Sequence, residues 1–212
     1  MCAPPYCRAR REGKGYQAVA AGLFHQPLAE DSPPQPLYHS HLVVRSDSTF
    51  RTPDDLMGST CTFNDRESLS GFDILRLWVA ATYGDAKPFF ASAMRSGGHM
   101  ASLDSLAKGS VDVAAVEFGV LRRAGFTPAG DSFDTMVSPD GKLRTLPGGT
   151  ERMPHPVQPF SVSPSVPPEV REVLRGAFAR LGALPAAFGP THAGFVTDAA
   201  ELDALYTPLE AK

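Results

Sequence analysis

The clearest chemistry in this sequence lies in the turn Ser68-Leu69-Ser70-Gly71, which opens a predicted helix. The first turn of a helix holds backbone N–H groups without helical acceptors and carries a partial positive charge. Two serine hydroxyls at that start, with a glycine that allows close approach to the backbone, predict an oxyanion site. The same pattern is typical of a simple N-cap formed by Ser68 or Ser70. Taken alone, these four residues favour the cap.

A second candidate group is His99, which follows Gly97 and Gly98 and opens the next predicted helix. An imidazole can donate a hydrogen bond to an anion, and more strongly when it is protonated, although a lone histidine is more often structural. Asp112 and Glu117 lie along a predicted strand and at its end. Five residues apart on an extended segment, their side chains point to opposite faces, so at most one should reach a given cleft. Asp112 can equally well cap a neighbouring loop.

Two further chemistries use the same residue types. With Ser70 as nucleophile and His99 as base, the protein would be a serine-dependent hydrolase. The sequence has no G-x-S-x-G elbow, and the backbone usually engages a serine at a helix N-cap, so we expect no enzyme. His39 and His41 place two imidazoles on one strand face. No third ligand lies within sequence reach, so we expect no metal and no other cofactor.

The cysteines Cys2, Cys7 and Cys61 leave at least one thiol unpaired. No C-x-x-C pair is present, so neither a metal site nor a catalytic thiol is expected. Cys2 and Cys7 can form a small disulfide loop or remain free thiols. The cysteines therefore leave the compartment open.

These candidate residues need secondary structure to position them, and the hydrophobic pattern predicts strands that alternate with helices. The predicted strands span residues 42–44, 60–63, 89–91, 111–116 and 159–162. The predicted helical segments span residues 53–58, 70–84, 100–108, 167–182 and 198–206. Such alternation is typical of an α/β protein with a mainly parallel sheet. The pattern is weak in residues 1–37 and 122–156.

Composition narrows the class of partner. The chain has 212 residues, 42% of them hydrophobic and 20% charged, which is ordinary for a soluble globular protein. A net charge of -3 argues against the broad basic surface of a nucleic-acid-binding protein. No apolar run approaches the roughly 20 residues of a membrane span, and the first residues lack the apolar core of a signal peptide. We therefore expect a soluble chain with a small-molecule or protein partner.

A series of short motifs occurs in a fixed order between about residues 38 and 120. In order they are Tyr38-His39-Ser40, Leu42-Val43-Val44, Asp55-Leu56-Met57-Gly58, Ser68-Leu69-Ser70-Gly71, Gly98-His99 and Val111-Asp112-Val113-Ala114. In this order and spacing they resemble the phosphonate/phosphite-binding proteins of ABC importers. That family has a Tyr-x-Ser strand, an Asp-Leu-x-Gly turn, a Ser-Thr-Ser-Gly helix start, a Gly-His turn and a Val-Asp-Val-Ala strand. The segment from Gln158 through the helix at Val170 fits more loosely.

The resemblance implies an α/β, two-lobed type 2 periplasmic-binding-protein fold, the Venus flytrap. It assigns residues 1–45 and 141–212 to the first lobe and residues 46–140 to a second lobe that carries the anion-binding helix start. It implies capture of a phosphonate, phosphite or phosphate-like oxyanion between the lobes, for uptake through an ABC-transporter permease and without catalysis. The expected location is periplasmic. An effector-sensing domain of the same fold is the alternative.

The resemblance also implies a set of ligand-binding residues. The set consists of Tyr6, Tyr38, Ser68, Leu69, Ser70, Gly71, His99, Glu117 and Gln158. Leu69 stands where the family has threonine, which removes one hydroxyl and keeps the backbone N–H. Gln158 stands where the family has an acidic residue, and Glu117 could balance an amine on the ligand or accept a hydrogen bond from a protonated phosphorus oxygen.

The front of the sequence departs from the family. The family begins with a strand, a helix and a second strand that have no counterpart here, and residues 1–6 resemble the end of that part, where Tyr6 could line the pocket. Without a central strand and its covering helix, an apolar sheet face and sheet edges would be exposed. We expect an incomplete first lobe, which indicates either an incomplete sequence or a reduced lobe and favours the first.

Overall fold

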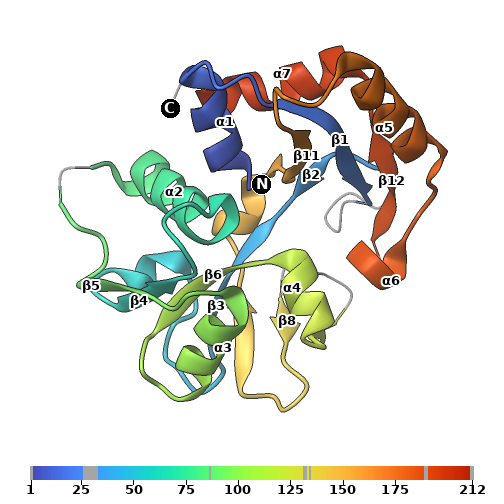
Figure 1. Cartoon of the computed structure of the whole chain (residues 1–212). Coiled ribbons are helices and arrows are strands. Elements are labelled where there is room, and N and C mark those ends of the chain that lie inside the picture. The colour runs from blue at the N-terminus through green and yellow to red at the C-terminus, as the bar shows by residue number, and fades with distance from the viewer. Residues whose placement is uncertain are drawn as a thin grey trace. The chain divides into compact units, whose positions relative to one another are not determined.

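A computed structural model describes residues 2–25, 33–85, 87–130, 133, 135–188 and 191–210 of the chain. The chain divides into two compact units, one formed by Met1–Tyr38 with Pro156–Lys212 and the other by His39–His155 (Figure 1). The sequence placed the corresponding boundaries at residues 45/46 and 140/141. Unit 2 extends beyond residues 46–140 because strands β3 (Ser40–Arg45) and β9 (Leu143–Leu146) belong to its sheet.

Unit 2 is built on one mixed sheet of strand order β5-β4-β6-β3-β9-β8-β7. Its other strands are β4 (Thr60–Phe63), β5 (Ser92–Arg95), β6 (Val113–Glu117), β7 (Thr127–Pro128) and β8 (Met136–Val137). Only β4 pairs in parallel, with β5 and with β6, and the remaining pairs are antiparallel. The prediction of a mainly parallel sheet was therefore wrong. Parallel pairs arise here only where a helix connects the strands.

Helices cover both faces of this sheet. They are η1 (Pro53–Leu56), η2 (Leu69–Asp73), α2 (Ile74–Tyr83), α3 (His99–Ala107), α4 (Phe118–Arg123) and η3 (Thr150–Arg152). Alternate residues of β6 enter two separate cores, as the period of two in a strand requires. Ala115 packs in the core that contains Trp78 of α2, and Val116 packs in the core that contains Leu106 of α3 and Leu121 of α4. The end of β6 thus lies between two well-packed layers.

Unit 1 contains a three-stranded antiparallel sheet of order β11-β1-β12, formed by Pro159–Val162, Gln17–Phe24 and His192–Val196. Its helices are α1 (Ala3–Arg11), α5 (Pro168–Arg180), α6 (Pro185–Phe188) and α7 (Ala199–Glu210). The Tyr6 ring meets the Tyr206 ring edge-on at 5.3 Å, which joins α1 to α7. The short strands β2 (Leu37–Tyr38) and β10 (His155–Pro156) pair with each other where the chain passes from one unit to the other.

The structure confirms most elements that the hydrophobic pattern predicts. Strands at 42–44, 60–63, 111–116 and 159–162 correspond to β3, β4, β6 and β11, and the helical segments correspond to η1, η2 with α2, α3, α5 and α7. The predicted strand at 89–91 was wrong, because Phe89 and Phe90 pack into the core beside Trp78 while the strand begins at Ser92. Within the described residues, no helix is long and apolar enough to cross a membrane.

Candidate functional site

The predicted anion site lies at the start of η2 and α2, which follow β4 after a short loop. The first helical bonds run from the N–H groups of Phe72 and Asp73 to the carbonyl of Ser68. The N–H groups of Leu69 and Ser70 precede these donors in the first turn, where a helix supplies no acceptor. Residues 69–83 form one continuous helical segment, so its positive end lies at these two groups.

Ser68 is the N-cap of this segment. Its Oγ accepts the backbone N–H of Gly71 at 3.2 Å, and its side chain is buried. The cap therefore uses the hydroxyl oxygen of Ser68 and leaves its proton for another acceptor. Leu69 is buried in the core with 2% of its surface exposed, so only its backbone can face a ligand.

Ser70 and His99 come together although they are 29 residues apart. The Oγ of Ser70 lies 3.1 Å from Nε2 of His99, at the start of α3. Asn64, which directly follows β4, reaches the same nitrogen, with its Nδ2 at 3.2 Å. The sequence did not single out Asn64. Its position after a buried strand, next to the serine turn, is the one signal that could have found it.

Gly71 is required by this packing. A β-carbon at residue 71 would lie 2.1 Å from Oδ1 of Asn64 and 3.0 Å from Cε1 of His99. Both distances are shorter than ordinary carbon contacts, and the amide of Asn64 is held by its bond to Asp65. The glycine of the motif therefore serves the approach of Asn64 and His99 to the helix start.

The pKa of His99 is lowered to about 4, chiefly by burial; the nearby backbone carbonyl of Ala115 raises it, and the positive charge of Arg123 contributes to lowering it. His99 is therefore neutral at neutral pH. Its contacts with Ser70 and Asn64 are both at Nε2, while Nδ1 is buried and has no hydrogen-bond partner among the described residues. Arg123 supplies a positive charge near the ring without a direct bond to it.

Glu117 and Asp112, which the sequence places on opposite strand faces, both bind backbone groups. Glu117 is the N-cap of α4 and accepts the N–H groups of Gly119 and Val120 at 2.6 and 3.0 Å. Burial raises the pKa of Glu117, against the effects of these bonds and of Arg123. Asp112 accepts the N–H and the hydroxyl of Thr60 at 2.8 and 2.7 Å, which ties β6 to β4.

The remaining predicted residues belong to unit 1. Tyr6 is 1% exposed, and its hydroxyl accepts the N–H of Ala18 at 2.9 Å, so its ring and hydroxyl are both used within this unit. Tyr38 ends β2 and is half-buried, and Gln158 directly precedes β11 and is exposed.

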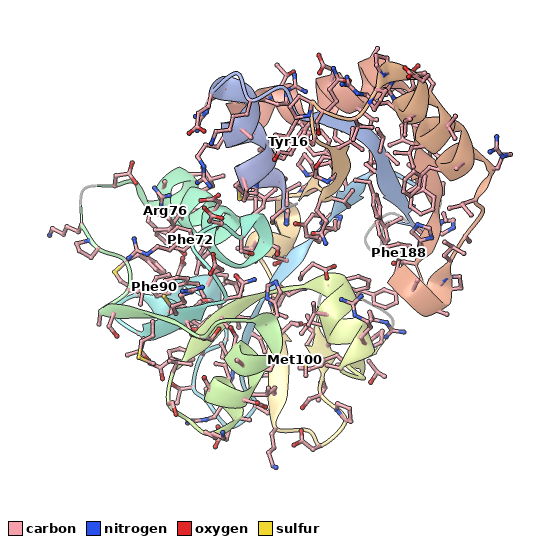
Figure 2. The ribbon with its side chains drawn as sticks, viewed as in Figure 1. Tyr16, Phe72, Arg76, Phe90, Met100 and Phe188 are labelled. Carbon is pink, nitrogen blue, oxygen red and sulfur yellow. The ribbon has the colours of Figure 1, made fainter. Side chains whose placement is uncertain are left out.

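Phe72 and Arg76 mark the outer side of the helix start (Figure 2). The guanidinium of Arg76 lies over the Phe72 ring at 5.5 Å, and Phe72 packs on Phe63 of β4 at 4.8 Å between ring centroids. This stack fixes the first turn of the helix to the end of β4. It therefore also fixes the loop that carries Asn64.

The two alternative functions from the sequence, a serine-dependent hydrolase and a metal site, can be compared with the structure. The Ser70–His99 pair has the spacing of a nucleophile and its base, but the third group on His99 is a donating amide and not an orienting carboxylate. Within the described part of the chain, no group of three metal-ligating side chains gathers, and Cys2, Cys7 and Cys61 form no disulfide with one another.

Solved structures with the same fold contain different ligands or belong to binding proteins of different names. XAC2383 from Xanthomonas citri, bound to ATP, is 18% identical with a TM-score of 0.61 over 99% of this chain and 74% of that chain. PhnD1 from Prochlorococcus marinus, in complex with methylphosphonate, is 11% identical with a TM-score of 0.63 over 100% and 82%. The periplasmic aliphatic sulphonate-binding protein SsuA from Escherichia coli is 16% identical with a TM-score of 0.55 over 84% and 48%. These likenesses confirm the predicted α/β fold of type 2 periplasmic binding proteins.

The sequence itself matches a family that is described as "ABC transporter, phosphonate, periplasmic substrate-binding protein", over residues 1–199. Among curated proteins, the comparison finds no match. Members of the matching family bind a substrate for transport and are not enzymes. The chain belongs to the periplasmic substrate-binding proteins of phosphonate ABC transporters.

Proposed function

We propose that this protein captures a phosphonate, phosphite or phosphate-like oxyanion at the start of η2 and delivers it to an ABC-transporter permease. The observation that carries the proposal is the convergence of Ser70, His99 and two first-turn N–H groups at one helix start. Backbone N–H groups there can donate to the oxygens of a tetrahedral anion, the Ser70 hydroxyl adds one more hydrogen-bonding group, and the helix end favours negative charge.

The surrounding charges support an anion as ligand. Arg123 contributes to the lowered pKa of His99, and its Nη2 lies 3.9 Å from Oε2 of Glu117, so it also offsets part of the charge of that carboxylate. The carboxylates of Glu117 and Asp112 are occupied by backbone N–H groups, which compensates their negative charge. Neutral donors with one cation nearby suit a ligand that must be released again, because no strong ion pair has to break.

The proteins with similar structures carry different ligands. Among the similar structures, one holds methylphosphonate, one holds ATP and one is a sulphonate-binding protein. In all three ligands, the oxygens are carried by a tetrahedral phosphorus or sulfur atom. The family match favours a phosphorus oxyanion. An effector-sensing role would use the same site and would differ only in the partner that reads the bound state.

Thermal-shift measurements with phosphate, phosphite, methylphosphonate and aminoethylphosphonate test the proposal. A ligand at 100 times its Kd adds about 2.7 kcal/mol to the free energy of unfolding, so a specific binder raises the Tm clearly. Ser70→Ala should reduce that shift, whereas Ser110→Ala, at an exposed residue outside the site, should keep it. If none of the four ligands raises the Tm of the wild-type protein, the proposal is wrong.

A further inference from the structure

Asn64 holds the imidazole of His99 through a hydrogen bond whose direction can be assigned. Oδ1 of Asn64 accepts the backbone N–H of Asp65 at 2.9 Å, so the amide nitrogen is the end that faces His99. That Nδ2 lies 3.2 Å from Nε2 of His99. An amide nitrogen donates and does not accept, so Nε2 must offer a lone pair and carry no proton.

Ser70 uses the same ring nitrogen. Its Oγ lies 3.1 Å from Nε2, and because Nε2 has no proton, the hydroxyl is the donor. A hydroxyl has one proton and two lone pairs, so Ser70 then faces any further partner as an acceptor. His99 stays neutral above its low pKa, and the direction of the pair is therefore kept at neutral pH.

We propose that Asn64 is a positioning residue that makes the Ser70–His99 pair a hydrogen-bond acceptor, so that the site selects an oxyanion which keeps one proton. This inference rests on the proposed function, because it concerns the ligand held at the same helix start. A monoanion of a phosphonate, phosphite or phosphate has one P–O–H group. That group donates to Oγ of Ser70, while the other oxygens accept the N–H groups of Leu69 and Ser70.

A sulphonate has a similar size and shape but carries no proton at neutral pH. To hold it, Ser70 must turn its proton toward the ligand and lose its bond to His99. Loss of one such bond corresponds to about a tenfold loss of affinity. The orientation of the Asn64 amide thus selects a protonated phosphorus oxyanion over a sulphonate. Asn64 does so through His99 and Ser70, without touching the ligand.

The protonation of His99 can be measured without any ligand. Asn64 is the only asparagine of the chain, so labelling with ¹⁵N-asparagine gives one side-chain amide to observe. Long-range ¹H–¹⁵N NMR of a ¹⁵N-histidine sample locates the proton on each ring, and the His99→Gln variant identifies the His99 signals. We expect the proton on Nδ1. A proton on Nε2 would overturn the positioning role of Asn64.

Calorimetry with methylphosphonate and methanesulphonate tests the selection. The wild-type protein should bind methylphosphonate about tenfold more tightly or better, and this preference should shrink as the pH rises through the second ionisation of that ligand. Asn64→Asp keeps an acceptor for the N–H of Asp65 but turns a carboxylate oxygen toward the ring, which draws the proton to Nε2. Its added negative charge weakens the binding of both ligands. The quantity to compare is therefore the ratio of the affinities for methylphosphonate and methanesulphonate, which should fall toward one. Asn64→Ala frees the ring and should give an intermediate ratio.

Equal wild-type affinities for the two ligands, or an unchanged ratio in Asn64→Asp, would sink the proposed selection. If no phosphorus oxyanion binds the wild-type protein, the proposed function fails and ligand selection fails with it. The NMR measurement still decides, independently of binding, whether Asn64 sets the proton of His99.

Discussion

Four polar side chains gather at one helix start, and together they support an interpretation that the serine motif alone leaves ambiguous: Asn64, Ser68, Ser70 and His99. Ser68 caps the helix, as the conservative interpretation of the sequence predicts, while Ser70 turns to His99. The two serines thus make different contacts, and the helix cap and the proposed anion site are not alternatives. The division depends on Asn64, whose partner is 35 residues away, a contact that no local pattern can reveal.

Gly71→Ala adds a single methyl group and should disturb the packing of Asn64 and His99 against the helix start. The added methyl group would collide with Oδ1 of Asn64 and press on Cε1 of His99, so both must shift. Overpacking of this kind costs about 1–3 kcal/mol of folding free energy. We expect lower stability in denaturant, followed by the fluorescence of Trp78, which is the only tryptophan and is buried in unit 2.

Gly98→Ala is the matched control for this substitution. Gly98 immediately precedes His99, its backbone is extended, and a β-carbon there meets nothing within 4 Å. It should leave both stability and ligand-induced shifts close to wild type. Equal effects of the two substitutions would mean that the fit of Asn64 and His99 around residue 71 has no special importance.

At the scale of elements, the sequence predicts the helices and strands that have a strong hydrophobic period and misses those that do not. Amphipathic segments such as α3 and α5, and the apolar strand β6, are visible in the pattern. The missed strand β1 consists largely of small residues, in the stretch QAVAAGLF. β5 was misplaced because all four of its residues are exposed, so no alternation marks it. Of the side chains that gather at the start of η2, the sequence indicated Ser68, Ser70 and His99 as candidates but not Asn64, whose contact with His99 comes from another element.

Substitutions of Glu117 can distinguish its role as the N-cap of α4 from a direct contact with the ligand. Glu117→Ala removes the acceptor for the N–H groups of Gly119 and Val120, which should cost about 1 kcal/mol. Glu117→Gln keeps an amide oxygen and should retain much of that stability. Denaturant unfolding of both variants measures the cap, and Asp85→Ala, at an exposed residue of unit 2, serves as the control.

The affinity for aminoethylphosphonate relative to methylphosphonate completes this test. Because both carboxylate oxygens of Glu117 accept backbone N–H groups, Glu117→Gln should leave the ratio of the two affinities unchanged. A clear loss of affinity for the amine-bearing ligand alone would show that Glu117 binds the ligand amine directly, as its position in the family suggested.

At the scale of the whole molecule, the buried histidines predict how stability depends on pH. Burial lowers the pKa of His41 to about 3 and that of His155 to about 4, and His99 also has a pKa of about 4. All three belong to unit 2. Both ring nitrogens of His41 are buried without a hydrogen-bond partner among the described residues, so nothing there would stabilise its charged form.

Unit 2 should therefore lose stability in mild acid. The unfolded pKa of histidine is about 6.5, so below that pH the unfolded chain binds more protons than the folded chain, and the free energy of unfolding falls. The stability is fully present above pH 6.5 and is lost as the pH drops toward the folded pKa. A histidine that stays neutral when folded costs about 2 kcal/mol at pH 5 relative to pH 7. Denaturant titrations at pH 7, 6 and 5, followed by Trp78, measure the loss.

His41→Leu isolates one part of this loss, because leucine fills the same apolar core beside Phe118 and cannot take up a proton. Its free energy of unfolding should fall less between pH 7 and pH 5, by about 2 kcal/mol, than that of the wild-type protein. The comparison uses the slope with pH, so a constant packing cost in the variant does not obscure it. Ser110→Ala, at an exposed residue of unit 2 that carries no titratable group, should keep the wild-type slope. If His41→Leu also keeps that slope, His41 is protonated in the folded state, and unit 2 must open around β3 to hydrate it.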